Sequence, residues 1–176
     1  MTMEINSELT PSTLAYQTII AAPVSTVWTT ISSPGILERC HPFCKENPVK
    51  QWPGVGARDR IIYDSGVVLD RKFLRWTENS GYELVIGRGN TAAAKVVWTI
   101  TPESNNHSSL KIAISIYPTI ALSRYPRLFL PLIRTFYFLP LMRQYVASVV
   151  KGFKYYVETG QVVQPNQFGK NRLFSA

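Results

Sequence analysis

A long apolar helix near the C-terminus constrains the fold more than any other feature of this sequence. The run LMRQYVASVVKGFKYYVETG, residues 141–160, contains no proline. It follows Pro140, which suits a first helical turn, and it ends at Gly160, which suits a helix C-terminus. Large apolar residues recur at helical spacing on two neighbouring stripes, so the apolar arc is wide. Such a helix needs a large surface to pack on, and the strands predicted before it are the candidate surface.

The residues before this helix follow strand and turn patterns. Turn sequences such as Asp64-Ser65-Gly66 and Gly89-Asn90 separate runs in which apolar and polar positions alternate. Two short helices are predicted at residues 23–33 and 36–40. The predicted strands are 14–22, 58–63, 67–76, 82–88, 91–101 and 110–117. Hairpins at this spacing predict an α+β fold, in which a curved antiparallel sheet of about six to seven strands wraps around the C-terminal helix.

Length and composition fit one globular domain. The chain has 176 residues, of which 45% are hydrophobic and 17% are charged, so a disordered chain is excluded. We predict a flexible tail at 1–13, a single domain at 14–160 and a peripheral C-terminal tail at 161–176. The start of the sequence lacks the basic and apolar regions of a secretion signal, and we therefore expect a cytoplasmic protein.

Three stretches carry a resemblance to a known superfamily. They are IIAAPVSTVWTTISSPGILERCHPF, PGVGARDRIIYDSGVVLDRKFL and GFKYYVETG. Together with the order of the predicted elements over residues 14–160, they resemble the START-like (SRPBCC) helix-grip superfamily. That superfamily includes polyketide cyclase/dehydrase-like and birch-pollen-allergen-like proteins. The resemblance implies an apolar cavity between the sheet and the last helix, holding lipids, polyketides, isoprenoids or hormones.

Residues 118–140 depart from the superfamily pattern, in which the last strand runs almost directly into the last helix. Arg124, Arg127 and Arg134 divide this segment into apolar runs too short to span a membrane. From residue 118 onwards, eight basic residues stand against one acidic residue, which is +7 of the net +8. The segment is interpreted as a lid, a membrane-docking surface with arginines on lipid phosphates, a homodimer surface, or a helix that only extends the core.

The sequence has no strong catalytic or metal-binding signature. A nucleophile elbow, a P-loop and a paired-histidine motif are all absent. Cys40 and Cys44 flank His41, but a structural zinc needs four ligands and the other histidine, His107, lies in a predicted loop. We expect free thiols, no metal and no cofactor. Nucleic-acid binding is not expected either, because the basic residues lie among bulky aliphatic ones.

Two positions are candidates for acid/base catalysis, His41 and Asp70. His41 ends the second short helix, where it serves as an acid/base or simply caps the helix. Asp70 and Arg71 are neighbours in a strand, so one points inward and the other outward. An inward Arg71 would hold a carboxylate or phosphate, whereas an inward Asp70 would act as a base. The alternative is a cross-strand ion pair with Arg58, Asp59, Glu83 or Lys95.

The predicted function is binding or transport of a hydrophobic small molecule or lipid between sheet and helix. One alternative is a cyclase/dehydratase-type enzyme using His41, Asp70 or a tyrosine; a non-catalytic role is favoured. The other is a peripheral membrane protein that docks through residues 118–140. The predicted ligand-binding residues are His41, Tyr63, Arg71, Phe73, Tyr82, Trp98, Ile112, Ile114, Tyr145, Val149, Phe153 and Tyr156.

Overall fold

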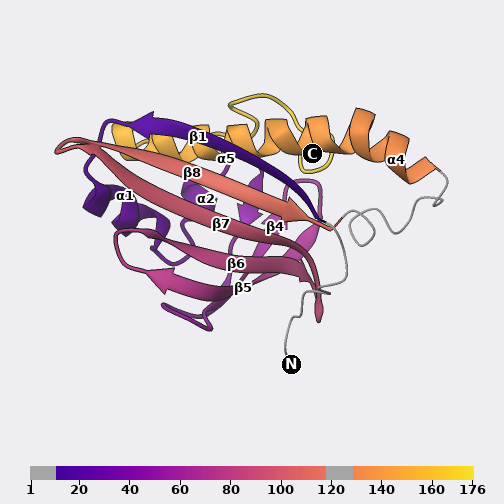
Figure 1. The fold of residues 1–176 in the computed structure, drawn as a ribbon, viewed down its shortest axis with the longest axis horizontal. Coiled ribbons are helices and arrows are strands. Elements are labelled where there is room, and N and C mark those ends of the chain that lie inside the picture. Colours follow the sequence, from indigo (N-terminus) through magenta and orange to yellow (C-terminus); the bar gives the residue numbers. More distant parts are fainter. Residues whose placement is uncertain (1–10, 118–128) are drawn as a thin grey trace.

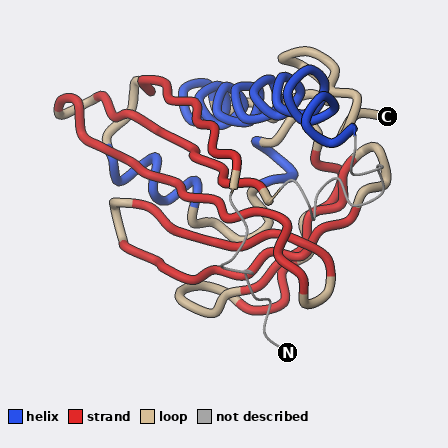
Figure 2. The backbone as a smooth tube through the Cα atoms, turned by 45° about the vertical axis from the view of Figure 1, so that its right-hand side comes forward, coloured by secondary structure: helices blue, strands red, loops and turns tan. Residues whose placement is uncertain are grey.

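The computed structural model describes residues 11–117 and 129–176 of the chain. Residues 1–10 and 118–128 lie outside this description, and with them Arg124 and Arg127 of the predicted insertion. In the described part, an antiparallel sheet curves around one long helix (Figures 1 and 2). The predicted α+β architecture is confirmed.

The sheet contains eight strands, and all of its hydrogen-bonded pairs are antiparallel. The order across the sheet is β1-β8-β7-β6-β5-β4-β2, and β3 also pairs with β4. The chain from β4 to β8 is therefore a meander. The first strand of the chain, β1, pairs with the last strand of this meander, β8. The strands are β1 (Ser12–Ile20), β2 (Cys44–Glu46), β3 (Val49–Gln51), β4 (Arg58–Tyr63), β5 (Val68–Thr77), β6 (Gly81–Arg88), β7 (Thr91–Ser104) and β8 (His107–Ile116).

The helices lie where the sequence predicts them, with one difference in length. Two short helices, α1 (Val24–Ile31) and α2 (Leu37–Cys40), follow β1. The long helix α5 (Leu139–Thr159) lies across the concave side of the sheet (Figure 1). It ends at Gly160, whose φ of 70° is a left-handed conformation that glycine adopts without strain.

The long helix begins earlier than the predicted start at Leu141. A short turn, α4 (Leu130–Leu132), and a widened π-turn, η2 (Ile133–Phe138), run directly into α5. Pro140 therefore lies inside a continuous helical segment, although a proline removes a hydrogen bond and crowds the preceding turn. The Leu139 N–H donates to the Arg134 carbonyl, five residues back. The wider turn offers the proline ring room that a regular α-helix lacks.

Six predicted strands match observed ones to within three residues at each end. The two strands that the sequence analysis missed, β2 and β3, have three residues each and pair with β4. So short a segment cannot show a repeating alternation. A register shift between Ile86 and Gly87 also separates Ala92 from the cavity-facing side chains Ala94, Val96 and Trp98 of β7. Ala92 packs with Val85 in a separate cluster, and Ala93 reaches the concave side instead.

An aromatic cluster fills the concave face beneath α1. The Trp28 ring of α1 contacts Trp76 at 5.4 Å, and Trp76 stacks on Tyr82 at 5.5 Å between ring centroids. Phe73 lies against Trp52 and Tyr82, each 5.0 Å away between centroids. This part of the concave face is solid core, so any ligand space must lie elsewhere between α5 and the sheet.

The closest approach of α5 to α2 depends on Gly152. A Cβ atom at this position would lie 2.1 Å from the Cys40 carbonyl oxygen and 3.3 Å from Pro42 Cδ. Alanine ordinarily favours a helix over glycine by about 1 kcal/mol. At this contact the steric clash outweighs that preference, because backbone atoms of α2 cannot yield as a flexible side chain would.

We therefore expect Gly152→Ala to lower the free energy of unfolding by about 1–3 kcal/mol, as overpacking does. Urea unfolding followed by circular dichroism measures this change. Lys151→Ala is the matched control, because Lys151 is the exposed neighbour on the same helix; it should shift stability by less than about 0.5 kcal/mol. A stabilised Gly152→Ala protein would show that the close approach is not required.

Candidate ligand cavity

A cavity of about 580 Å³ lies between α5 and strands β4 to β8. Its walls are mainly aliphatic and aromatic. On the sheet side, Ile112, Ile114 and Ile116 of β8 point inward because strand side chains alternate between the two faces. Further apolar lining side chains are Leu37, Ile61, Leu84, Val96, Trp98, Met142, Val146 and Val149.

A chain of three buried polar side chains lies in the cavity wall. Tyr145 of α5 is the middle member. Its hydroxyl lies 3.1 Å from His41 Nε2 and 2.9 Å from the hydroxyl of Tyr63. The Phe43 backbone N–H donates to His41 Nδ1 over 3.2 Å. Because Nδ1 accepts this bond, the ring hydrogen is assigned to Nε2, which donates to the Tyr145 oxygen.

Burial keeps this chain neutral. Desolvation, with a smaller contribution from the charge of Arg71, lowers the pKa of His41 to about 3. Desolvation likewise raises the pKa of Tyr145 to about 12 and raises the pKa of Tyr63 well above its ordinary value. At neutral pH the site therefore contains a neutral imidazole and two protonated phenols. Both ring nitrogens of His41 are engaged within the protein, so neither is poised to accept a proton.

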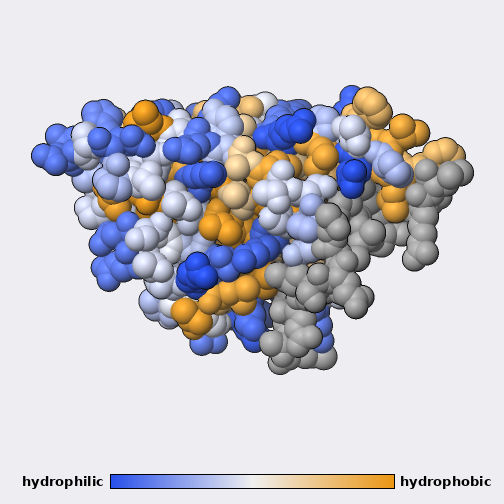
Figure 3. All heavy atoms as spheres, viewed as in Figure 1, coloured by the Kyte–Doolittle hydropathy of each residue, from blue (hydrophilic) through white to orange (hydrophobic). Residues whose placement is uncertain are grey.

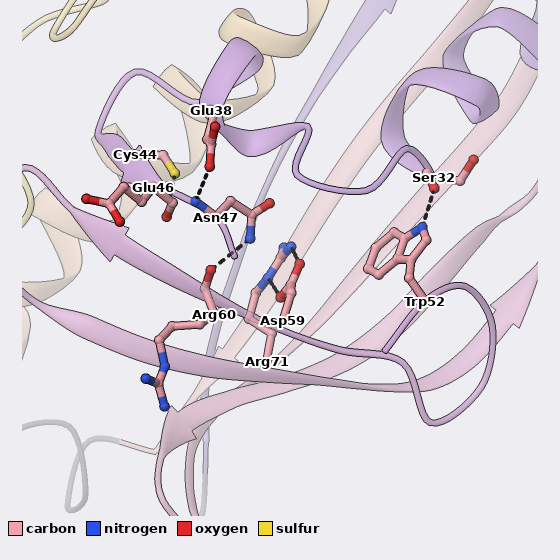
Figure 4. A network of polar contacts seen from close by, with 9 residues as sticks. All are labelled: Ser32, Glu38, Cys44, Glu46, Asn47, Trp52, Asp59, Arg60 and Arg71. Atoms are coloured by element: carbon pink, nitrogen blue, oxygen red, sulfur yellow. Dashed lines mark hydrogen bonds and ion pairs between the residues drawn. The ribbon is translucent and has the colours of Figure 1, made fainter. Parts of the chain in front are cut away.

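Arg71 also faces inward, where it pairs with Asp59 directly across from it on β4 (Figure 4). The Arg71 Nε donates to Asp59 Oδ1 over 2.7 Å, and Arg71 Nη2 donates to Oδ2. Burial alone would lower the pKa of Arg71, but the charge and hydrogen bonds of Asp59 outweigh burial and raise it. The guanidinium lies 5.4 Å from the centroid of the Phe73 ring.

Asp70 points to the opposite side of the sheet. Arg60 Nε donates to Asp70 Oδ1 over 2.8 Å, and both side chains are about one-third exposed. The structure thus places Arg71, and not Asp70, on the concave side. The two predicted catalytic candidates, His41 and Asp70, are not brought together, and Asp70 does not line the cavity.

The other predicted ligand-binding residues divide into two groups. The first group lines the cavity together with His41, Tyr63 and Arg71, and consists of Trp98, Ile112, Ile114, Tyr145 and Val149. Phe73 and Tyr82 belong to the aromatic cluster instead. Phe153 packs edge-on against Trp98 at 4.8 Å between centroids, and Tyr156 accepts a hydrogen bond from Arg39 over 3.1 Å. The cavity lining therefore does not include Phe73, Tyr82, Phe153 or Tyr156.

The C-terminal segment, predicted to be peripheral, completes the cavity wall. Phe174 packs on both tyrosine rings, 4.4 Å from Tyr63 and 4.5 Å from Tyr145 between centroids. Asn171 is fully buried and donates to the Leu141 carbonyl over 2.8 Å. Lining residues that were not predicted from the sequence include Phe174, Leu173, Arg88, Thr91, Phe138 and Met142. The apolar pair Leu173-Phe174 after a largely polar run was the available signal.

Cys40 is buried and Cys44 is half-buried, and neither forms a disulfide. Desolvation raises the pKa of Cys44 to about 12 and raises that of Cys40 further. Both are therefore protonated thiols at neutral pH, which are poor nucleophiles and poor metal ligands.

The comparisons with known proteins agree with this geometry. No protein-family model matches the sequence, and no curated protein matches it. A Mesorhizobium loti protein matches with a TM-score of 0.61 at 17% identity, over 86% of this chain and 100% of that one. The chain has the helix-grip fold.

Two further helix-grip structures show how varied proteins of this fold are. Norcoclaurine synthase from Thalictrum flavum matches with a TM-score of 0.58 at 12% identity, over 85% of this chain and 95% of the other. Aha1 from Colwellia psychrerythraea, solved as a dimer, matches with a TM-score of 0.62 at 13% identity, over 85% and 98%. At these identities the likeness shows the fold alone, and function must be argued from the cavity.

The buried neutral His41 predicts a specific dependence of stability on pH. Its pKa is about 3 in the folded protein against an ordinary 6.5, so the unfolded chain takes up the proton first as pH falls. Stability from this group is complete above pH 6.5 and is lost towards pH 3, on the order of 1 kcal/mol per pH unit.

We expect His41→Gln to flatten the slope of unfolding free energy against pH within this window, as measured by urea unfolding at several pH values. His107→Gln is the matched control, because the His107 side chain is exposed at the β7–β8 turn. It should retain the wild-type slope. Equal slopes for His41→Gln and wild type would contradict the assignment of a neutral buried imidazole.

Proposed function

We propose that the protein binds a hydrophobic small molecule or lipid in the cavity between the sheet and α5. The observation that carries this proposal is a predominantly apolar cavity of about 580 Å³ with a few convergent polar groups. Sites for small organic ligands typically have volumes of about 300–1,000 Å³ and this composition. The solid aromatic cluster beside it argues that the hollow is not a general feature of the core.

The hydrophobic effect supplies the main favourable free energy for such a function. A ligand that buries about 300 Å² of apolar surface gains about 7.5 kcal/mol at about 25 cal/mol per Å². Association opposes this gain through lost translational and conformational freedom. The net affinity therefore depends on a preformed cavity that keeps these opposing costs small, and the packed walls of β4 to β8 and α5 support that condition.

Binding or transport is favoured over a cyclase/dehydratase-type reaction by the state of His41. Its two ring nitrogens are engaged with Phe43 and Tyr145, and its pKa of about 3 keeps it neutral. Asp70, the other candidate acid/base, lies on the outer side with Arg60. The tyrosine hydroxyls remain as hydrogen-bond donors that orient a ligand, which is the role a binding site needs.

We expect Ala94→Trp to abolish cavity binding by filling the space, because Ala94 is a buried lining residue of β7. Displacement or saturation of N-phenylnaphthylamine fluorescence measures this binding, with at least a tenfold loss expected. Ala113→Trp is the matched control, because Ala113 lies on the adjacent strand with its side chain on the other face of the sheet. Equal binding by wild type and Ala94→Trp would contradict the proposed site.

A contact with membranes is the second candidate function, favoured by the exposed side chains of the segment leading into α5. Phe129, Leu132 and Phe136 are 51%, 58% and 77% exposed and are spaced as on one helical face. Figure 3 shows apolar side chains gathered at the end of the molecule where α4 and η2 lie. The neighbouring residues Phe138 and Met142 line the cavity, so the exposed apolar face adjoins it.

The chemistry of this segment suits the interface of an anionic bilayer rather than its interior. Arg134 is exposed between Leu132 and Phe136, and the C-terminal third has most of the net positive charge. Within residues 11–117 and 129–176, no helix is long and apolar enough to cross a membrane. We propose that Phe136 and its neighbours insert among lipid headgroups while Arg134 contacts phosphates.

We expect Phe136→Glu to reduce co-sedimentation with phosphatidylserine-containing vesicles about tenfold, because it replaces an inserted aromatic ring with a charge of the same sign as the lipid. Val55→Glu is the matched control, since Val55 is 69% exposed in the turn between β3 and β4. Wild-type co-sedimentation that is insensitive to anionic lipid and to salt would argue against this contact.

A further inference from the structure

We propose that the ligand carries an oxygen acceptor, a carbonyl or a carboxylate, which binds between Arg71 and the hydroxyls of Tyr63 and Tyr145. This inference rests on the proposed binding function and specifies the chemistry of the ligand's polar end. It follows from a count of hydrogen-bond donors and acceptors in the cavity wall.

The His41–Tyr145–Tyr63 chain has one hydrogen more than its own bonds use. Neutral His41 supplies one N–H, and each tyrosine supplies one O–H. Two hydrogen bonds join the three groups, so one hydroxyl hydrogen is left over whichever tyrosine donates to the other. Both tyrosines line the cavity, and the structure gives neither hydroxyl another partner among the described residues. The spare hydrogen is therefore available to an acceptor in the cavity.

Arg71 adds further donors to the same wall. Its Nε and Nη2 atoms are bonded to Asp59, whereas its Nη1 atom has no hydrogen-bond partner among the described residues. Asp59 fixes the guanidinium plane, so the remaining N–H groups are held without the cost of ordering a free arginine. Arg71 lines the cavity. As expected of a neighbour, its charge adds to the lowering of the His41 pKa and partly offsets the rise that burial causes in the pKa of Tyr145.

The charge balance of the wall points to an acceptor rather than a donor. No aspartate or glutamate lines the cavity within the described residues, and Asp59 offsets only the charge of Arg71. Arg88 lines the cavity as well and leaves an excess of one positive charge. An ammonium head would meet like charges and hydrogen-bond donors, whereas a carbonyl or carboxylate oxygen would satisfy the donors already present.

Four probes that share a naphthalene body separate the head group from the apolar body. They are ethylnaphthalene, acetylnaphthalene, naphthoate and naphthylmethylammonium, each titrated against bound N-phenylnaphthylamine. Acetylnaphthalene differs from ethylnaphthalene only by its carbonyl oxygen. We expect the ammonium probe to bind most weakly. Acetylnaphthalene tests a carbonyl as the proposed acceptor, and naphthoate tests a carboxylate.

The decisive variant is the double substitution Asp59→Leu/Arg71→Met, which removes both charges and leaves neither partner buried alone. We expect it to weaken acetylnaphthalene and naphthoate by about tenfold or more and ethylnaphthalene by less than about threefold. Arg60→Met/Asp70→Leu is the matched control. It removes the adjacent Arg–Asp pair of the same two strands on the outer side, and it should leave all four affinities within about threefold of wild type.

A measurement on the wild-type protein is independent of the fold of any variant. The infrared carbonyl stretch of bound acetylnaphthalene should lie below its position in hexane, because donated hydrogen bonds weaken the C=O bond. A stretch at the hexane position, or equal losses for the ketone and the ethyl probe in Asp59→Leu/Arg71→Met, would overturn the inference while cavity binding stands. Failure of every probe, including N-phenylnaphthylamine, would overturn the binding function itself and the inference with it.

Discussion

The packing of the apolar face of α5 against the concave sheet is the interaction on which the rest of the structure depends. Towards its C-terminal end the helix lies close to α2 and to the sheet. A Cβ atom at Gly152 would lie 2.1 Å from the Cys40 carbonyl oxygen, and the Phe153 ring lies 4.8 Å from that of Trp98 between centroids. Towards its N-terminal end the same helix faces small side chains such as Ala93 and Ala94. The helix and the curved sheet therefore enclose both a close-packed core and a cavity.

The hollow fixes the state of the polar groups that face it. A lone buried charge would be costly, and each buried ionisable group of the cavity wall is either neutral or paired. Arg88, which also lines the cavity, is exposed. His41 and the two tyrosines are neutral, and Arg71 is held by Asp59. A buried ion pair of this kind contributes little net stability compared with apolar side chains of the same volume. In the proposed binding mode, the pair instead offers directed N–H groups of Arg71 to the ligand.

The sequence predicted the elements well, because strands and helices impose a periodicity that side-chain patterns show directly. The inward face of β8 could be predicted from the alternation of Leu110, Ile112, Ile114 and Ile116. The direction of Arg71 could not, since adjacent Asp70 and Arg71 fit either face until the register with β4 is known. The role of Phe174 was only partly visible: the apolar pair Leu173-Phe174 indicates packing, but the local sequence does not show what it packs against.

The C-terminal segment packs against the polar groups of the cavity wall. Phe174 covers both tyrosine rings, and its position is held by hydrogen bonds from Ser65 to the Leu173 carbonyl and from Asn171 to α5. In the proposed binding mode Phe174 would lie beside the ligand's oxygen, because it packs on both tyrosine rings and lines the same cavity. The tail therefore shapes the part of the cavity where we propose that the polar end of a ligand binds, although it lies outside the sheet and helix that define the fold.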